Sequence, residues 1–177
     1  KEESVEAIAE LEVKTEFGPF RLVCMEDHIN QAVHLALVRG EPDPKTPTLV
    51  RVHIQDTLSD VVGIQDTRLG WPLRDAMKLI AEEGCGVVVI LRQEELPKEL
   101  MRAVRGLETE LDDLVIRRDR TAELKTFGTG AQILRALNVQ RMRVLSAPKH
   151  MHAISGFGLE VVEYVSSEEF VDEGDAN

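Results

Sequence analysis

Residues 49–56 read LVRVHIQD, and apolar side chains alternate with polar ones along this stretch. A period of two with many β-branched residues predicts a β-strand. We expect one face of the strand to be buried, while the other face carries Arg51, His53 and Gln55. These three side chains are candidates for ligand contacts, although a solvated strand edge would explain the same pattern.

A helix and a second strand follow this stretch. Trp71-Pro72 predicts the start of a helix, since proline in the first turn loses no hydrogen bond, and Gly84 predicts its end. Residues 86–91 read GVVVIL, a continuous apolar run that predicts a strand covered on both faces. The polar residues 92–94 come directly after it, at the strand end where open α/β sheets bind ligands.

Outside this unit the sequence alternates between hairpin-spaced strands and helix–strand units. This order predicts an α/β (α+β) fold in which a mixed β-sheet has helices packed on it. We expect Gly128 and Gly130 to form a short turn before a helix. The further expected elements are strands at 11–15, 20–25, 34–38, 141–146 and 159–165, and helices at 97–109, 127–138 and 148–155.

The domain boundaries are predicted from composition. Residues 1–10 (KEESVEAIAE) are expected to be a helix end or a linker from a preceding domain, because so few apolar side chains cannot anchor it. Residues 11–165 form the main domain, with a mobile loop at 108–120, and residues 166–177 are an acidic tail expected to be disordered. Because the chain begins with Lys1, we expect it to be part of a longer polypeptide.

Composition narrows the class of protein. A length of 177 residues suits one domain, and aromatic residues at 4% predict an aliphatic core. A net charge of −11 disfavours binding to nucleic acid or to an anionic membrane. We find no signal peptide and no apolar run long enough to cross a bilayer, so a cytoplasmic protein is expected. Cys24 and Cys85 form no C-x-x-C pair and are expected to be small buried hydrophobes.

Three segments carry a resemblance to a known family. They are TLVRVHIQD at 48–56, LGWPLRDAMKLIAEEGCGVVVILRQEE at 69–95 and FGTGAQILRALNVQRMRVLSAPK at 127–149. Together they resemble GTP cyclohydrolase II, which opens the guanine ring of GTP at the first step of riboflavin synthesis. The resemblance implies that family's fold and a homodimer. It also implies a position as the C-terminal domain of a polypeptide whose N-terminal domain is a 3,4-dihydroxy-2-butanone 4-phosphate synthase.

The zinc site of the resembled family has no counterpart in this sequence. In the family three cysteines hold the metal, and the matching positions here are Asp56, Thr67 and Leu69. One carboxylate, one hydroxyl and one aliphatic side chain cannot replace three thiolates. We therefore expect no metal and no cofactor, and His53 with Asp56 could bind a cation only in a newly built site.

The substrate contacts of the family are also altered. Its R-Q-E-G-R motif is reduced to Arg92, Gln93 and Glu94, which Glu95 and Leu96 follow. A carboxylate near the expected phosphate position would repel a triphosphate.

The positions of the family's general base and arginine nucleophile carry Glu123 and Lys125, and those of T-N-N-P-K-K carry Ser146 and Lys149. A lysine cannot present the planar fork of a guanidinium. The candidate ligand contacts are therefore Arg51, His53, Gln55, Arg92, Glu94, Ser146 and Lys149.

Two hypotheses follow from these losses. The first is a non-catalytic domain that serves as a regulatory, dimerisation or scaffolding module for an attached synthase domain, which would be the enzymatic part of the polypeptide. The alternative is a repurposed nucleotide-binding or hydrolase site, with GTP cyclohydrolase II-type activity, in the old GTP cleft. A domain that only keeps its fused partner soluble is a third possibility.

Overall fold

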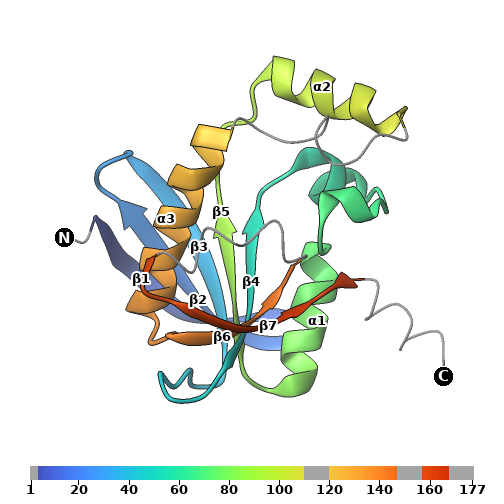
Figure 1. Cartoon of the computed structure of the whole chain (residues 1–177). Coiled ribbons are helices and arrows are strands. Elements are labelled where there is room, and N and C mark those ends of the chain that lie inside the picture. Colours follow the sequence, from blue (N-terminus) through green and yellow to red (C-terminus); the bar gives the residue numbers. More distant parts are fainter. Residues whose placement is uncertain (1–3, 110–119, 147–156, 168–177) are drawn as a thin grey trace, which may run out of the picture.

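The computed structural model describes residues 4–109, 120–146 and 157–167, without the side chains of 120–125. They form a seven-stranded mixed sheet in the order β1-β2-β3-β5-β4-β6-β7 (Figure 1). The fold class predicted from the sequence is confirmed. The strands are β1 Val5–Thr15, β2 Gly18–Asp27, β3 Ala32–Arg39, β4 Thr48–Ile54, β5 Gly86–Leu91, β6 Arg141–Leu145 and β7 Glu160–Val165. The helices are α1 Leu73–Glu83, α2 Pro97–Leu107 and α3 Arg120–Ala136, with two short turns of helix, η1 Thr57–Val62 and η2 Thr67–Leu69.

The sheet combines two strand arrangements. β1, β2 and β3 are antiparallel neighbours, and β3 runs antiparallel to β5. β5, β4, β6 and β7 are parallel to one another. The carboxyl ends of β4, β5 and β6 therefore lie at one edge of the sheet, which is where ligand sites of such sheets are found.

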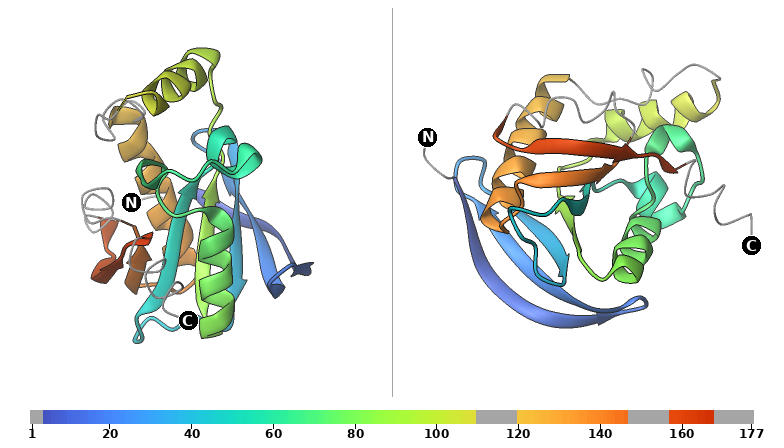
Figure 2. Two further views of the ribbon diagram at one scale, coloured as in Figure 1. Left: turned by 90° about the vertical axis from the view of Figure 1, so that its right-hand side faces the viewer. Right: turned by 60° about the horizontal axis from the view of Figure 1, so that its bottom comes forward.

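Each face of the sheet has its own core, one that includes residues of α3 and one that includes residues of α1. The two helices lie on opposite sides of the sheet (Figure 2). On one face Val50 and Val52 of β4 pack with Ile133 and Leu134 of α3. On the other face Leu49 packs with residues of α1 and with Phe20, Leu37, Trp71, Val88 and Leu145. Alternate residues of β4 thus serve both cores, because successive side chains of a strand point to opposite faces.

The helices predicted at residues 72–84 and 97–109 are confirmed, as are their end signals. Pro72 precedes the first turn of α1, and Gly84 ends it with φ 84°, a left-handed conformation that glycine adopts without strain. Pro97 is the first residue of α2. Among the described residues, no helix is both apolar enough and long enough to pass through a bilayer.

The expectation for residues 1–10 is wrong from Val5 onward. These residues continue β1, which pairs with β2 from Val5 to Thr15. Backbone hydrogen bonds anchor the segment, so it does not depend on the large apolar side chains whose scarcity suggested a linker. Ser4 is also buried, and its N–H and its hydroxyl both donate to Oε1 of Gln132.

The turn predicted at Gly128 and Gly130 is wrong too. Both glycines lie inside α3, which begins at Arg120. A Cβ on Gly130 would lie 3.4 Å from Cγ1 of Val52, an ordinary contact, so Gly130 is on the side of the helix that faces β4. The two cysteines are free and half-buried rather than buried. Residues 110–119 of the loop predicted at 108–120, the helix predicted at 148–155 and most of the acidic tail lie outside the described residues.

Candidate functional site

Arg51 and His53 lie close together beneath the loop that joins β4 to α1. Only 8% of Arg51 and 2% of His53 is exposed to solvent. The alternative of a solvated strand edge is therefore wrong for these two residues. The loop covers them, since Asp60 of η1 contacts His53 and a Cβ on Gly70 would lie 3.2 Å from Nη2 of Arg51.

A chain of hydrogen bonds joins Arg51, His53 and Asp60. Nη2 of Arg51 lies 3.2 Å from Nδ1 of His53, and because a guanidinium can only donate, Nδ1 must accept. Nε2 of His53 therefore carries the proton and donates to Oδ1 of Asp60 at 2.7 Å. Nη1 of Arg51 donates to the carbonyl of Leu145 at 3.3 Å. The group thus connects β4 to both the loop and the end of β6.

Burial determines the charge states of this group. It lowers the pKa of Arg51 to about 10, partly offset by the charge of Asp60. Burial also lowers the pKa of His53 despite its hydrogen bond to Asp60, so the imidazole is neutral at physiological pH. The pKa of Asp60 is lowered. Burial acts to raise it, but the hydrogen bonds from His53 and from the Asp56 amide outweigh the effect of burial. The site holds one cation and one anion with a neutral imidazole between them.

Aspartates cap both short helices of the covering loop. Asp56 accepts a hydrogen bond from the Leu58 amide at 3.2 Å, and its own amide donates to Asp60 at 2.9 Å. Asp66 accepts from the Arg68 amide at 3.0 Å. An aspartate at a helix N-terminus satisfies amides that lack intrahelical partners. The loop is therefore held together by its own carboxylates.

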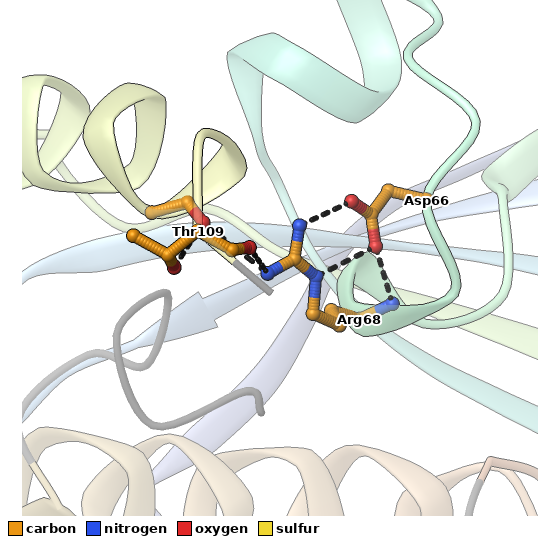
Figure 3. A network of polar contacts seen from close by, with 4 residues as sticks. Asp66, Arg68 and Thr109 are labelled. Atoms are coloured by element: carbon orange, nitrogen blue, oxygen red, sulfur yellow. Dashed lines mark hydrogen bonds and ion pairs between the residues drawn. The ribbon is translucent and has the colours of Figure 1, made fainter. Parts of the chain in front are cut away.

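Arg68 ties this loop to α2 (Figure 3). Its guanidinium donates to Asp66 and, on the other side, to the carbonyls of Gly106 at 3.2 Å and Thr109 at 2.8 Å. These carbonyls lie at the C-terminal end of α2, where a cation is favourable. Sequence reasoning missed Asp60, Asp66 and Arg68. Asp66 could have been found as a capping signal, whereas the contact of Asp60 with His53 and those of Arg68 with α2 depend on the tertiary structure.

The three positions that correspond to the family's zinc ligands do not fit zinc. The carboxylate of Asp56 already accepts a capping hydrogen bond, Thr67 is exposed and Leu69 has no donor atom. In the part of the chain that the structure describes, no group of three His, Cys, Asp or Glu side chains is placed to hold a metal. Neither the donor chemistry nor the geometry of these positions suits a trithiolate-type site.

The residues after β5 do not gather around Arg51 and His53. The Arg92 amide donates to Nδ1 of His34 and its guanidinium to the carbonyl of Val33, so Arg92 lies against β3. Glu94 is exposed. Glu95 turns to the covering loop and accepts a hydrogen bond from the Thr57 hydroxyl at 2.6 Å.

The remaining predicted residues are placed only in part. Ser146 is buried and follows Leu145, whose carbonyl accepts from Arg51. Gln55 follows the end of β4 and is exposed, and its backbone N–H donates to the carbonyl of Leu91. The backbone of α3 includes Glu123 and Lys125, but their side chains and the whole of Lys149 lie outside the described part of the chain.

Known proteins resemble this chain along almost its whole length. A family model described as GTP cyclohydrolase II matches residues 6–166. Proteins named 3,4-dihydroxy-2-butanone 4-phosphate synthase from Photobacterium phosphoreum and Pseudomonas aeruginosa are 40% and 42% identical over 94% of this chain. The match covers 44% and 45% of those proteins, so this chain spans less than half of their length.

A solved structure is similar as well. It is the crystal structure of RibBX, a two-domain 3,4-dihydroxy-2-butanone 4-phosphate synthase from A. baumannii. The superposition has a TM-score of 0.64 at 30% sequence identity and covers 94% of this chain and 41% of the other.

Proposed function

This chain belongs to the GTP cyclohydrolase II family, and from that premise we propose that it is a non-catalytic member that serves a 3,4-dihydroxy-2-butanone 4-phosphate synthase as a regulatory, dimerisation or scaffolding module. One observation carries the proposal. The positions matching the family's three zinc thiolates are Asp56, Thr67 and Leu69, and the Asp56 carboxylate caps a helix instead. No water can be activated there by a thiolate-bound metal.

The surroundings of β5 support the same proposal. Arg92 is directed along β3, and Glu95 adds a carboxylate beside the covering loop. A triphosphate at this end of β5 would meet negative charge without a glycine turn to bind it. The side chains of Arg92 and Glu95 thus make contacts within the domain.

The partner is proposed from the relatives. Two proteins named as synthases contain a segment similar to this chain within a polypeptide more than twice its length, and the similar solved structure is a two-domain synthase. We propose that the synthase domain is this chain's partner, either fused to it or associated with it. The homodimer and a cytoplasmic location belong to the same proposal.

The absence of catalysis can be tested directly. The purified chain is incubated with zinc and GTP, and bound zinc and released formate are measured. We expect less than about 0.1 zinc per chain and no formate above the uncatalysed rate. Stoichiometric zinc together with formate release would overturn the non-catalytic proposal.

The regulatory role is tested by adding the chain to a purified synthase domain and measuring the rate of its reaction. A saturable change in rate or in synthase stability is expected, and no effect on either would contradict the role. A repurposed site is tested in parallel with a thermal shift panel of nucleotides and riboflavin intermediates. A ligand present at 100 times its dissociation constant adds about 2.7 kcal/mol of stability, which this assay detects.

A further inference from the structure

The outer side of helix α2 carries a stripe of basic and apolar side chains. Lys98, Met101 and Arg105 are all exposed, and their spacing of three and four residues places them on one side of the helix. Met101 is 53% exposed, and Val104 beside it is 45% exposed. Gly106 is buried on the side of α2 that faces the domain. The stripe of Lys98, Met101 and Arg105 is therefore open to a binding partner.

The two cations of the stripe have no ion pair with any residue that the structure describes. Glu108 is exposed one turn after Arg105, yet the two side chains do not form an ion pair. The chain as a whole has a net charge of −11, so carboxylates outnumber cations. Two unpaired cations beside exposed apolar side chains indicate a surface for an acidic segment that also carries apolar side chains.

One of the segments outside the described residues has this chemistry. Residues 168–177 read EEFVDEGDAN, with five carboxylates, no cation, a phenylalanine and a valine. Residues 110–119 combine four carboxylates with two arginines, and residues 147–156 have no carboxylate. Residues 1–3 are a lysine and two glutamates. Charge complementarity therefore favours residues 168–177.

The loop between β4 and α1 connects the end of β7 to the C-terminal end of α2 (Figure 1). Nε1 of Trp71 donates to the carbonyl of Val165 at 2.8 Å, and Nη1 of Arg68 donates to the carbonyl of Thr109 at 2.8 Å. These contacts limit the separation of Val165 and Thr109 to roughly 35 Å, whereas residues 166–177 extend to about 40 Å. The acidic segment is therefore long enough to reach α2.

We propose that residues 168–177 bind along the stripe of α2 in the same chain, with their carboxylates against the two cations and their apolar side chains against Met101. Exposed ion pairs are individually weak. A tethered segment, however, has a high effective concentration, so even a weak contact is largely formed. Since α2 belongs to neither core, the segment is a second attachment of this helix beside Arg68. The inference is independent of the proposed function.

Amide hydrogen exchange of the whole chain tests the contact. Asp172→Lys with Glu173→Lys reverses two charges of the segment and leaves the sequence of α2 unchanged. We expect exchange in α2 to become about threefold to tenfold faster, while exchange in α1 stays the same. The control reverses two other exposed carboxylates, Glu12→Lys with Glu41→Lys, and should leave exchange in α2 unchanged. Equal exchange in α2 in the two double variants would overturn the proposal.

A charge exchange tests the pairing of the segment with the stripe. Lys98→Glu with Arg105→Glu should also loosen α2. Adding Asp172→Lys and Glu173→Lys to that variant should slow exchange in α2 at least about threefold. The two proteins have the same α2 sequence, so intrinsic exchange rates do not affect the comparison. Unchanged or faster exchange in the fourfold variant would overturn the pairing.

Two further measurements test which molecule occupies the stripe. Protection of α2 in the wild type should not depend on protein concentration. Protection that rises with concentration would mean that the segment of another copy is bound, and would overturn the assignment to the same chain. Wild-type chain should also fail to sediment with phosphatidylglycerol vesicles. Sedimentation that Lys98→Glu with Arg105→Glu abolishes would make the stripe a membrane-binding surface and overturn the proposal.

Discussion

His53 is buried, and its hydrogen bonds give it a structural role. Its two ring nitrogens are committed, Nδ1 to Arg51 and Nε2 to Asp60, and only 2% of its surface is exposed. A histidine so enclosed has no free nitrogen for a substrate or a metal. The neutral ring is hydrogen-bonded to a buried cation on one side and to a half-buried anion on the other.

His53 should therefore make the protein sensitive to acid. Its pKa is lowered from 6.5 on folding, so below pH 6.5 the unfolded chain binds more protons than the folded one. The stability that this residue contributes is present above pH 6.5 and is lost as the pH falls. When the pH is lowered from about 7.5 to about 5.5, we expect the free energy of unfolding of the wild type to fall by about 1 kcal/mol more than that of His53→Gln. Urea unfolding at both pH values measures this, and His34, whose pKa is also lowered, remains in both proteins. Equal losses of stability in the wild type and in His53→Gln would show that His53 does not cause the acid sensitivity.

Asp60 should contribute to the stability of the fold although it lies in a loop. Asp60→Ala leaves the Nε2–H of buried His53 without its acceptor, and the Asp56 amide loses its partner as well. We expect the free energy of unfolding to fall by about 1–3 kcal/mol. The control is Glu12→Ala on the exposed strand β1, which should change it by less than about 0.5 kcal/mol. Equal effects of the two substitutions would show that the buried group is not supporting the loop.

None of the residues of helix α2 belongs to either core. Polar contacts therefore hold this helix against the rest of the domain. Arg68 binds the carbonyls at its C-terminal end, so Arg68→Ala should loosen the whole helix. We expect amide hydrogen exchange in α2 to become about tenfold faster, while exchange in α1 stays unchanged. Arg102→Ala, on the exposed side of the same helix, is the control. Unchanged exchange after Arg68→Ala would mean that other contacts hold α2.

The glycines of two elements should respond differently to alanine. A Cβ on Gly86 would lie 2.8 Å from the carbonyl oxygen of Leu49 and 2.8 Å from Cγ2 of Ile80, so Gly86→Ala must displace backbone. On Gly130 the nearest atom would be 3.4 Å away, an ordinary contact. We expect Gly86→Ala to cost about 2 kcal/mol or more and Gly130→Ala to be tolerated, since alanine favours helix. Thermal unfolding of the two variants distinguishes them.

The elements that could be predicted are those whose signals are local. Strand β4, helix α1 and strand β5 follow from residue alternation, Pro72, Gly84 and an apolar run. The strand predicted at 11–15 is the second part of β1, but residues 5–10 of this strand were missed, because hydrogen bonds to β2 hold them and they carry few large apolar side chains. The start of α3 was misplaced because Gly128 and Gly130 fit a turn by propensity and a helix by packing. The carbonyls that Arg68 binds, those of Gly106 and Thr109, lie 38 and 41 residues away, and no local pattern reveals such pairs.

At the scale of the whole molecule, stability should not depend on metal. The loop between β4 and α1 is held by Asp56, Asp60, Asp66 and Arg68. Neither a chelator nor added zinc should therefore shift the melting temperature by more than about 1 °C, whereas domains with structural zinc unfold when it is removed. Differential scanning calorimetry with EDTA and with zinc measures this. A fall in the melting temperature with EDTA would reveal a metal that the described donors do not explain.

The carboxylate caps of the loop between β4 and α1 also change which stresses the domain can withstand. A loop built on three thiolates fails when peroxide oxidises sulfur or when zinc is scarce. Oxygen and nitrogen hydrogen bonds are inert to both conditions, so this loop keeps its shape in a metal-starved or oxidised cell. The loop is instead sensitive to low pH. We therefore expect the domain to unfold under acid stress before it unfolds under oxidation or metal starvation.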